Sequence, residues 1–243
     1  MAADPALSAD PALSAGGAGA AARAGGAGAA GGGGLRGFAR RRRAVVLGAL
    51  VAVFALVVGY LAGLLVPRFT APGDNSPEAG FARDMSTHHA QAVEMAMVAW
   101  RNATDPEVRQ VAYDIATVQE NQIGTMQSWL VTWHLSPTGS RPKMAWMPNG
   151  TRELLPDGRM PGMASDAELP QLESATGTRV DVLFCQLMLR HHLGGIHMAS
   201  AILSLSHNQQ VVDLATTMKN NQQGEVTILR QKLDQLHAQP LPS

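Results

Sequence analysis

The chain has 243 residues, and its 19 basic side chains balance its 19 acidic ones, so the formal net charge is zero. This balance lacks the basic surplus that nucleic-acid binding requires, and we predict no nucleic-acid partner. The single cysteine, Cys185, excludes an internal disulfide framework.

The N-terminal part divides into a tail and an apolar run. Residues 1–39 are rich in Ala and Gly and poor in large apolar side chains, a composition that predicts disorder. Four arginines, Arg40 to Arg43, precede the run from Ala44 to Val66, which has 23 residues and no charge. About 20 apolar residues suffice to cross a membrane, and basic clusters stay on the cytoplasmic side. We therefore predict a disordered cytoplasmic tail over residues 1–43, a transmembrane helix over residues 44–66 and an extracytoplasmic C-terminal part.

A cleaved signal peptide is the alternative interpretation of this run. The apolar region of a signal peptide spans about 7–15 residues and precedes a cleavage site with small residues. The run here is longer, and no clear small-x-small site follows it. The sequence therefore favours an uncleaved anchor and a location in the cell membrane.

Helix signals follow the predicted linker, residues 67–75. Ser76 and Asp105 each precede a proline, which places a capping side chain before a residue suited to the first helical turn. The predicted helices cover approximately residues 76–101, 104–134, 178–206 and 208–238. A Met-rich loop, also rich in Pro and Gly, is predicted over residues 135–164. Four helices with one long connection predict an all-α fold, an antiparallel four-helix bundle over residues 76–239.

An internal repeat relates the two halves of the predicted bundle. Residues 78–130 align with residues 181–233 at a constant offset of 103, without a gap. Core periodicity explains part of the match, because any two amphipathic hairpins share it. The motif Met-x-x-His-His, which occurs in both halves, is not explained in this way. The repeat therefore predicts that one helical hairpin was duplicated.

Both histidines of each pair flank the middle of the apolar helix face, at 100° per residue. The candidate metal ligands are His88, His89, His191, His192, Met85, Met188, Met95, Met198, Glu78 and Asp181. Glu94 and His197 instead point to the opposite side. The alternative is that the inward histidines are core residues satisfied by hydrogen bonds. Four of them at equivalent positions are costly to bury unless they are paired or liganded, so we favour metal binding.

The donor types favour copper over iron. Di-iron carboxylate bundles use Glu-x-x-His on two helices, whereas this chain has Met85-x-x-His88 and Met188-x-x-His191. Thioether and imidazole together select copper, especially Cu(I). The predicted loop adds two Met-x-x-Met pairs, either as further donors or as ordinary packing: Met144, Met147, Met160 and Met163. Zinc is the less favoured alternative, at a site that combines histidine with one of the two acids.

At these residues the sequence resembles the bacterial family called domain of unknown function 305, over about residues 76–236. The resemblance rests on Met85-x-x-His88-His89 with Met95-Ala96, on Met160-Pro-Gly-Met163 followed by Ser165 and Glu168-Leu169, and on Asp181-x-x-Phe184-x-x-x-Met188-x-x-His191-His192 with Met198-Ala199. It implies a ferritin-like four-helix fold outside the cytoplasm, copper binding in some members and no settled activity. The chain departs from the usual pattern at Leu193-Gly194-Gly195 and at His197.

These observations together predict a membrane-anchored, extracytoplasmic protein that binds copper for sequestration, resistance or delivery. Its predicted partners are the membrane, through Ala44–Val66, and a metal ion, while a homo-oligomer and a metal-delivery partner stay open. The sequence shows no nucleophile–base pair or phosphate loop, which favours a protein without enzymatic activity. Two alternatives remain: a metal-dependent oxidoreductase, and a metal-free interaction or stress module with core histidines.

Overall fold

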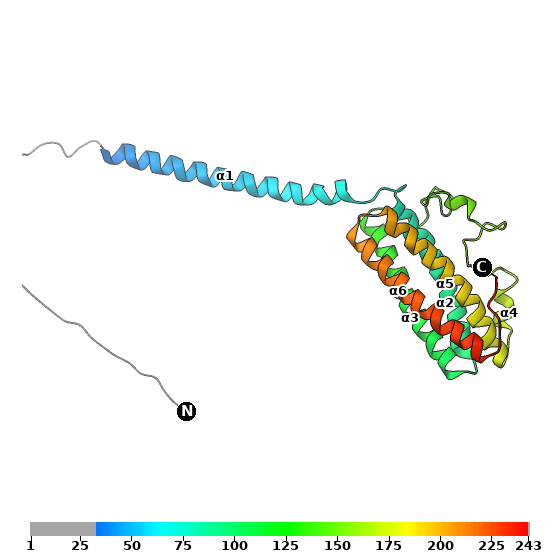
Figure 1. Ribbon diagram of the computed structural model, residues 1–243. Helices are drawn as coiled ribbons and strands as arrows, with labels where there is room; N and C mark the ends of the chain where they lie inside the picture. Colours follow the sequence, from blue (N-terminus) through cyan, green and yellow to red (C-terminus); the bar gives the residue numbers. More distant parts are fainter. Residues whose placement is uncertain (1–32, 243) are drawn as a thin grey trace, which may run out of the picture. The chain divides into compact units, whose positions relative to one another are not determined.

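The computed structural model describes residues 33–242, and all regular secondary structure in that part of the chain is helical. The elements are α1 (Gly33–Thr70), α2 (Pro77–Asn102), α3 (Pro106–Thr132), the short 3-10 helix η1 (Gly150–Arg152), α4 (Leu169–Glu173), α5 (Thr178–Leu205) and α6 (Gln209–Gln235). The prediction of an all-helical chain is therefore confirmed. The chain divides into two compact units, Met1–Leu61 and Ala62–Ser243, and α2 to α6 belong to the second, here called the C-terminal unit (Figure 1).

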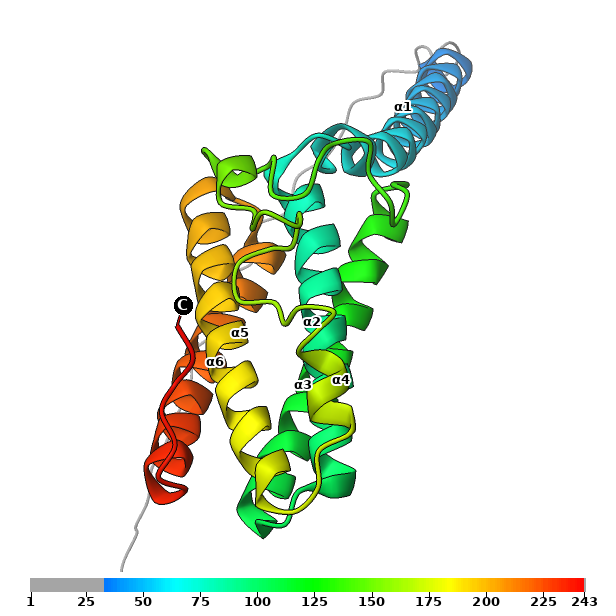
Figure 2. The same ribbon diagram turned by 90° about the vertical axis from the view of Figure 1, so that its right-hand side faces the viewer.

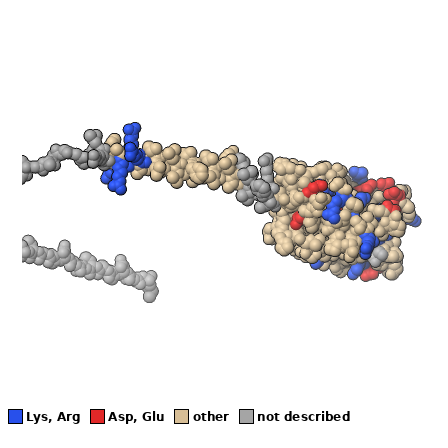
Figure 3. Space-filling view, turned by 90° about the horizontal axis from the view of Figure 1, so that it is seen from above, with Lys and Arg blue, Asp and Glu red and all other residues tan. Residues whose placement is uncertain are grey.

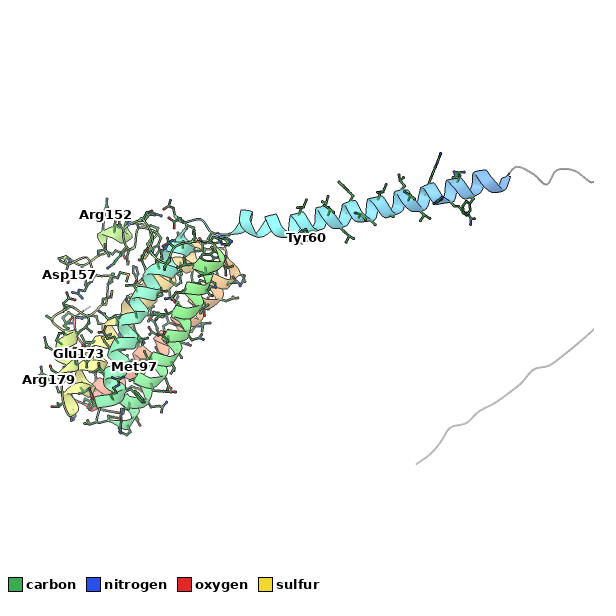
Figure 4. The ribbon with its side chains drawn as sticks, turned by 180° about the vertical axis from the view of Figure 1, so that it is seen from behind. Tyr60, Met97, Arg152, Asp157, Glu173 and Arg179 are labelled. Atoms are coloured by element: carbon green, nitrogen blue, oxygen red, sulfur yellow. The ribbon has the colours of Figure 1, made fainter. Side chains whose placement is uncertain are left out.

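The first unit contains most of α1, whose stretch Phe38–Gly63 is long and apolar enough to cross a membrane by length and composition. Its large side chains, including Tyr60, are exposed along the whole stretch (Figure 4). The arginine cluster lies at one end, and no charged residue follows it on the helix as far as Gly63 (Figure 3). The helix includes residues 33–43, which the composition predicts to be disordered, and extends to Thr70. An apolar helix, once nucleated, propagates easily into flanking Ala, Leu and Arg. Residues 1–32 of the predicted tail lie outside the described residues.

Helices α2 and α3 begin at the capping residues that the sequence indicates. The Ser76 hydroxyl accepts a hydrogen bond from the Ala79 N–H at 3.1 Å. One Asp105 carboxylate oxygen accepts from the N–H groups of Glu107 and Val108 at 2.7 and 3.3 Å. These side chains satisfy N–H groups that have no partner within the helix, and the prolines that follow need none.

The four long helices of this unit form two hairpins, α2 with α3 and α5 with α6. Helix α2 packs against α3 and α5, and α5 packs against α6 (Figure 1). Helices α2 and α5 run in opposite directions: Glu78 at the start of α2 accepts from the Ser206 hydroxyl after α5. At the other end, Asp181 at the start of α5 accepts from the Thr104 N–H just after α2.

The core of the C-terminal unit consists of two apolar clusters with a band of polar side chains between them. Along each helix, one cluster ends before the polar residues begin and the other starts after them. The first cluster includes residues of 92–99, 108–116, 180–189 and 226–233, and the second includes residues of 79–85, 126–133, 198–202 and 211–218. We call the band the polar layer; it consists of His88, His89, Gln119, Gln122, His191, His192 and Gln222.

Candidate metal centre

The polar layer is fully internal, although it contains four imidazoles and three amides. The histidines are at most 1% exposed and the glutamines at most 5%. Each of the four long helices contributes to it, with α2 and α5 supplying the histidines. Buried polar groups cost free energy unless they have partners. The unpartnered atoms of the layer therefore lower the stability of the fold unless a ligand contacts them.

Neighbouring histidines on one helix point in directions about 100° apart around the helix axis. The two rings of each pair therefore face different neighbours. The first ring of each pair faces the other pair: the His88 and His191 rings are 3.8 Å apart between centroids and tilted by 36°. The second ring faces the partner helix of its own hairpin. His89 bonds Gln122 on α3, and His192 bonds Glu225 on α6.

Three of the rings donate a hydrogen bond through Nε2 to an oxygen. The acceptors are the Pro161 carbonyl oxygen for His88 at 3.2 Å, Gln122 Oε1 for His89 at 2.8 Å and Glu225 Oε2 for His192 at 2.6 Å. A neutral imidazole with its hydrogen on Nε2 carries a lone pair on Nδ1. Metal-bound histidines are held in the same manner, by an oxygen on the nitrogen that does not bind the metal.

Four of the remaining ring nitrogens are buried and have no hydrogen-bond partner among the described residues. They are Nδ1 of His88, His89 and His192 and Nε2 of His191. Each histidine therefore offers one nitrogen lone pair in the interior, and this is the donor set that a borderline or soft metal ion requires. The residues of the layer thus fit a metal ion in the type of donor they supply.

Burial also keeps three of the imidazoles in the uncharged form that binds metals. Desolvation lowers the pKa of His88 to about 4, against the opposing effect of the bond to Pro161, and the neighbouring His192 lowers it further. Desolvation and the nearby His88 lower the pKa of His89 to about 3. Desolvation, followed by the three other histidines, places the pKa of His191 well below its ordinary value. At neutral pH these rings are uncharged and need not release a proton to bind a metal.

We expect the metal-free protein to lose stability as the pH falls from 6.5 to 4.5. In this window the unfolded chain protonates these histidines while the folded chain does not, so stability is highest above pH 6.5. The His88 shift alone corresponds to a loss on the order of 2–3 kcal/mol by pH 4.5. Denaturant unfolding followed by tryptophan fluorescence measures this loss. The variant His88→Leu should show a smaller loss and His207→Asn, at an exposed position, an unchanged one; equal slopes in all three proteins would contradict the interpretation.

The four predicted methionine ligands are all fully buried beside the layer. Met95 and Met188 belong to the first apolar cluster, and Met85 and Met198 belong to the second. Each side of the layer therefore has one thioether from α2 and one from α5. The second cluster also contains Met126, Met144, Met147, Met160, Met163 and Met218.

The two predicted acidic ligands lie away from the layer. Glu78 and Asp181 are each ten residues before a layer histidine, which corresponds to roughly 15 Å along a helix. Glu78 accepts from the Ser206 hydroxyl at 2.7 Å. Asp181 accepts from the Thr104 hydroxyl and from the N–H groups of Thr104 and Asp105. Both carboxylates thus tie the end of one hairpin to the turn of the other, and we leave them out of the candidate centre.

The connection between α3 and α5 lies across the outside of α2 and α5 (Figure 2), and it brings Pro161 to His88. Gly194 and Gly162 allow this approach: a Cβ atom on Gly194 would lie 2.1 Å from the Pro161 oxygen, and one on Gly162 would lie 2.6 Å from the Arg190 oxygen. Gln91 fixes the position of Ala164 in the same connection, because the Gln91 amide both donates to and accepts from the Ala164 backbone. The glycine at position 194 is thus required by close packing.

Two carboxylates join the same connection to the helices α5 and α2. Glu168 accepts two hydrogen bonds from the Arg190 guanidinium at 2.9 and 2.7 Å, which lowers the pKa of Glu168 to about 2. Asp84, beside Met85 on α2, accepts from the Met144 N–H and from the Trp146 indole N–H. Desolvation raises the pKa of Asp84, although these two bonds oppose the rise.

Sequence reasoning missed Asp84, Pro161 and the hydrogen-bond partners of the histidines. Gln122 and Glu225 are not among the ligands that the sequence predicts. One signal could have found them: each stands 33 residues after the second histidine of its hairpin, at positions related by the repeat. Asp84 has no such counterpart, because the other hairpin carries Leu187 there.

The layer supplies donors without closing a cage around an ion. Among the described residues, no three His, Cys, Asp or Glu side chains are grouped closely enough to hold a metal. A complete coordination sphere built from this layer therefore needs a donor of another kind, such as thioether sulfur, or a rotated imidazole. The flanking methionines are the nearest source of such donors in the sequence.

Comparison with known proteins identifies the family. Residues 78–233 match the family described as a domain of unknown function, DUF305. The chain is similar to a solved DUF305 protein from Streptomyces coelicolor, predicted to be secreted, with 39% identity, a TM-score of 0.64 and coverage of 70% of this chain and 100% of that one. It is also similar to a DUF305 fragment from Deinococcus radiodurans, with 29% identity, a TM-score of 0.54 and coverage of 65% and 96%.

A third solved structure is that of CopM in the Cu(II)-bound form, with 26% identity, a TM-score of 0.52 and coverage of 66% of this chain and 97% of that one. None of the curated proteins compared with the sequence matches it. The family match spans well over half of the 243 residues and includes both histidine pairs. The chain therefore belongs to the DUF305 family.

Proposed function

We propose that this protein binds copper outside the cytoplasm, for sequestration, resistance or delivery, while anchored to the membrane. The observation that carries the proposal is the polar layer, in which four buried imidazoles each present a nitrogen without a partner. Each such atom lowers the stability of the core, because a buried polar atom without a hydrogen-bond partner costs free energy. Bound metal ions would give these nitrogen atoms partners.

Copper is the metal that the donors favour. The ligands we propose first are His88, His89, His191 and His192, joined by thioethers of the flanking Met85, Met188, Met95 and Met198. Imidazole with thioether selects copper over the hard cations. CopM, a structural neighbour, has been solved with Cu(II) bound, which supports copper binding within this fold. A zinc site that uses Glu78 or Asp181 has little support, because both carboxylates are engaged at the helix ends.

The proposal is tested by copper competition on the full-length protein in detergent. We expect Cu(I) to bind in the nanomolar range or tighter against a chromophoric chelator, and to be lost in the variant with all four histidines replaced by alanine. Tight binding that survives in this variant would reject the site. No binding by the folded wild-type protein would reject the function and favour a metal-free module whose histidines are core residues.

The fold and location that go with this function are also proposals. We infer that α2, α3, α5 and α6 form an antiparallel, ferritin-like four-helix bundle that arose by duplication of one hairpin. The contacts Glu78–Ser206 and Asp181–Thr104 support the duplication, since each acid of the repeat binds the turn of the other hairpin.

The arginine cluster before the apolar helix leads to a prediction about topology. Basic residues stay on the cytoplasmic side, so the C-terminal unit should lie outside and the anchor should remain attached. A reporter that is active only outside the cytoplasm, fused after Ser243, should be active and should sediment with membranes. Activity of a cytoplasm-only reporter at the same position would contradict this topology, and a soluble active fusion would indicate cleavage.

A further inference from the structure

The two halves of the polar layer differ at one pair of equivalent positions. His89 and His192 correspond through the repeat, and so do their partners, Gln122 and Glu225. His89 Nε2 is 2.8 Å from the Gln122 amide oxygen, whereas His192 Nε2 is 2.6 Å from a Glu225 carboxylate oxygen. One half of the layer therefore has a neutral partner and the other has an acidic one.

This difference affects how firmly each ring is oriented. A carboxylate can only accept a hydrogen bond, so Glu225 requires the hydrogen of His192 on Nε2 and leaves the lone pair on Nδ1. An amide carries both a donor and an acceptor, and Gln122 can turn to present either one to His89. The lone pair of His192 that faces the interior is thus fixed, while that of His89 depends on the orientation of the amide.

The difference also places a charge beside one half only. The His192 side chain is fully buried and that of Glu225 is 18% exposed. Among the described residues, no Arg or Lys forms an ion pair with Glu225. A carboxylate that is not neutralised by Arg or Lys attracts a dication more strongly than a monocation, and partial burial reduces the screening of that attraction.

We propose that Glu225 is a positioning residue that makes the His192 half of the layer the tighter copper site and favours Cu(II) over Cu(I) there. The inference rests on the proposed copper function. Gln122 leaves the His89 half without a charge, and that half binds copper more weakly. The repeat has therefore produced two related half-sites with different preferences for the charge of the ion.

The test compares the full-length wild-type protein with Glu225→Gln and Gln122→Glu. Loss of a carboxylate that orients a histidine ligand typically weakens metal binding by about 10–100-fold. We expect Glu225→Gln to weaken Cu(II) binding by this factor and Cu(I) binding by much less. The reduction potential of the bound copper should then rise by about 59 mV for each tenfold difference. Gln122→Glu should change both quantities in the opposite direction, and Glu120→Gln, at an exposed position on α3, should change neither.

A readout without metal separates this inference from the copper function. Nitrogen NMR of the metal-free protein should show the His192 hydrogen on Nε2 in the wild type and a mixture of tautomers in Glu225→Gln. Wild-type protein that binds no copper would overturn the proposed function and the copper preference inferred here.

If the wild type binds copper, the Cu(I) and Cu(II) affinities of the variants test the role of Glu225. Equal changes of Cu(I) and Cu(II) affinity in Glu225→Gln, or none, would overturn it. If Glu225→Gln fails to fold, Gln122→Glu decides: a selective gain for Cu(II) supports the inference, and no gain overturns it.

Discussion

Replacing the two facing imidazoles by leucine, His88→Leu together with His191→Leu, should stabilise the metal-free protein and abolish its stabilisation by copper. The rings are 3.8 Å apart between centroids, and each has a buried nitrogen without a partner. Leucine has a similar volume and no polar atoms. Exchanging buried polar groups for apolar ones of similar shape is neutral to stabilising, but the Pro161 carbonyl oxygen loses its hydrogen bond from His88, so we expect a net gain of about 1 kcal/mol at most.

Copper should reverse the order of stability of the wild type and the leucine variant. A ligand that binds only the folded state adds about 4 kcal/mol of stability at a concentration of 1,000 times its Kd. The wild type should gain this increment, and the leucine variant should not. Thermal unfolding with and without Cu(I) measures both effects, because all four tryptophans lie in the C-terminal unit. His207→Leu is the control that should respond to copper as the wild type does; an equal copper response in the double variant would contradict the account.

Gly194→Ala should destabilise the C-terminal unit strongly although it adds only one methyl group. The new Cβ would lie 2.1 Å from the carbonyl oxygen of Pro161 and 2.8 Å from its carbonyl carbon. Both atoms are backbone, so the segment around Pro161 must move away from α5 and from His88. We expect a loss on the order of 3 kcal/mol, at the upper end of the usual cost of overpacking.

The control for this variant is Gly224→Ala on α6, where nothing lies within 4 Å of the added atom. Alanine is the better helix former, so this change should stabilise the protein by about 0.5–1 kcal/mol. Denaturant midpoints of the two variants, measured by tryptophan fluorescence, should therefore shift in opposite directions. Similar midpoints would mean that the connection does not rest on α5 at Gly194.

The elements of the fold could be predicted because their signals are local. Ser76 and Asp105 satisfy N–H groups of their own helices, and prolines follow them at positions where a helix tolerates proline. Helix ends were harder to predict. The last helix ends at Gln235 rather than near residue 238, because His237 adopts a positive φ of 52° that ends the helical path.

The histidines of the candidate centre could be predicted because helical periodicity places them on the apolar face. Their surroundings could not, since these depend on contacts between distant segments. Pro161 is 73 residues from His88, and only the close approach permitted by Gly194 joins them. Glu78 and Asp181 show the converse. Periodicity places them on the same face as the histidines, but their distance along the helix leaves them at the turns.

The proposed function depends on the binding of copper to the imidazoles of the polar layer. X-ray absorption at the copper edge of the loaded full-length protein tests it most directly, because imidazole rings give a characteristic multiple-scattering signal and thioethers a separate sulfur shell. We expect imidazole and sulfur ligands in the wild type and loss of the imidazole signal when His88, His89, His191 and His192 are replaced by alanine. A copper spectrum without imidazole scattering, or one that these four replacements leave unchanged, would contradict it.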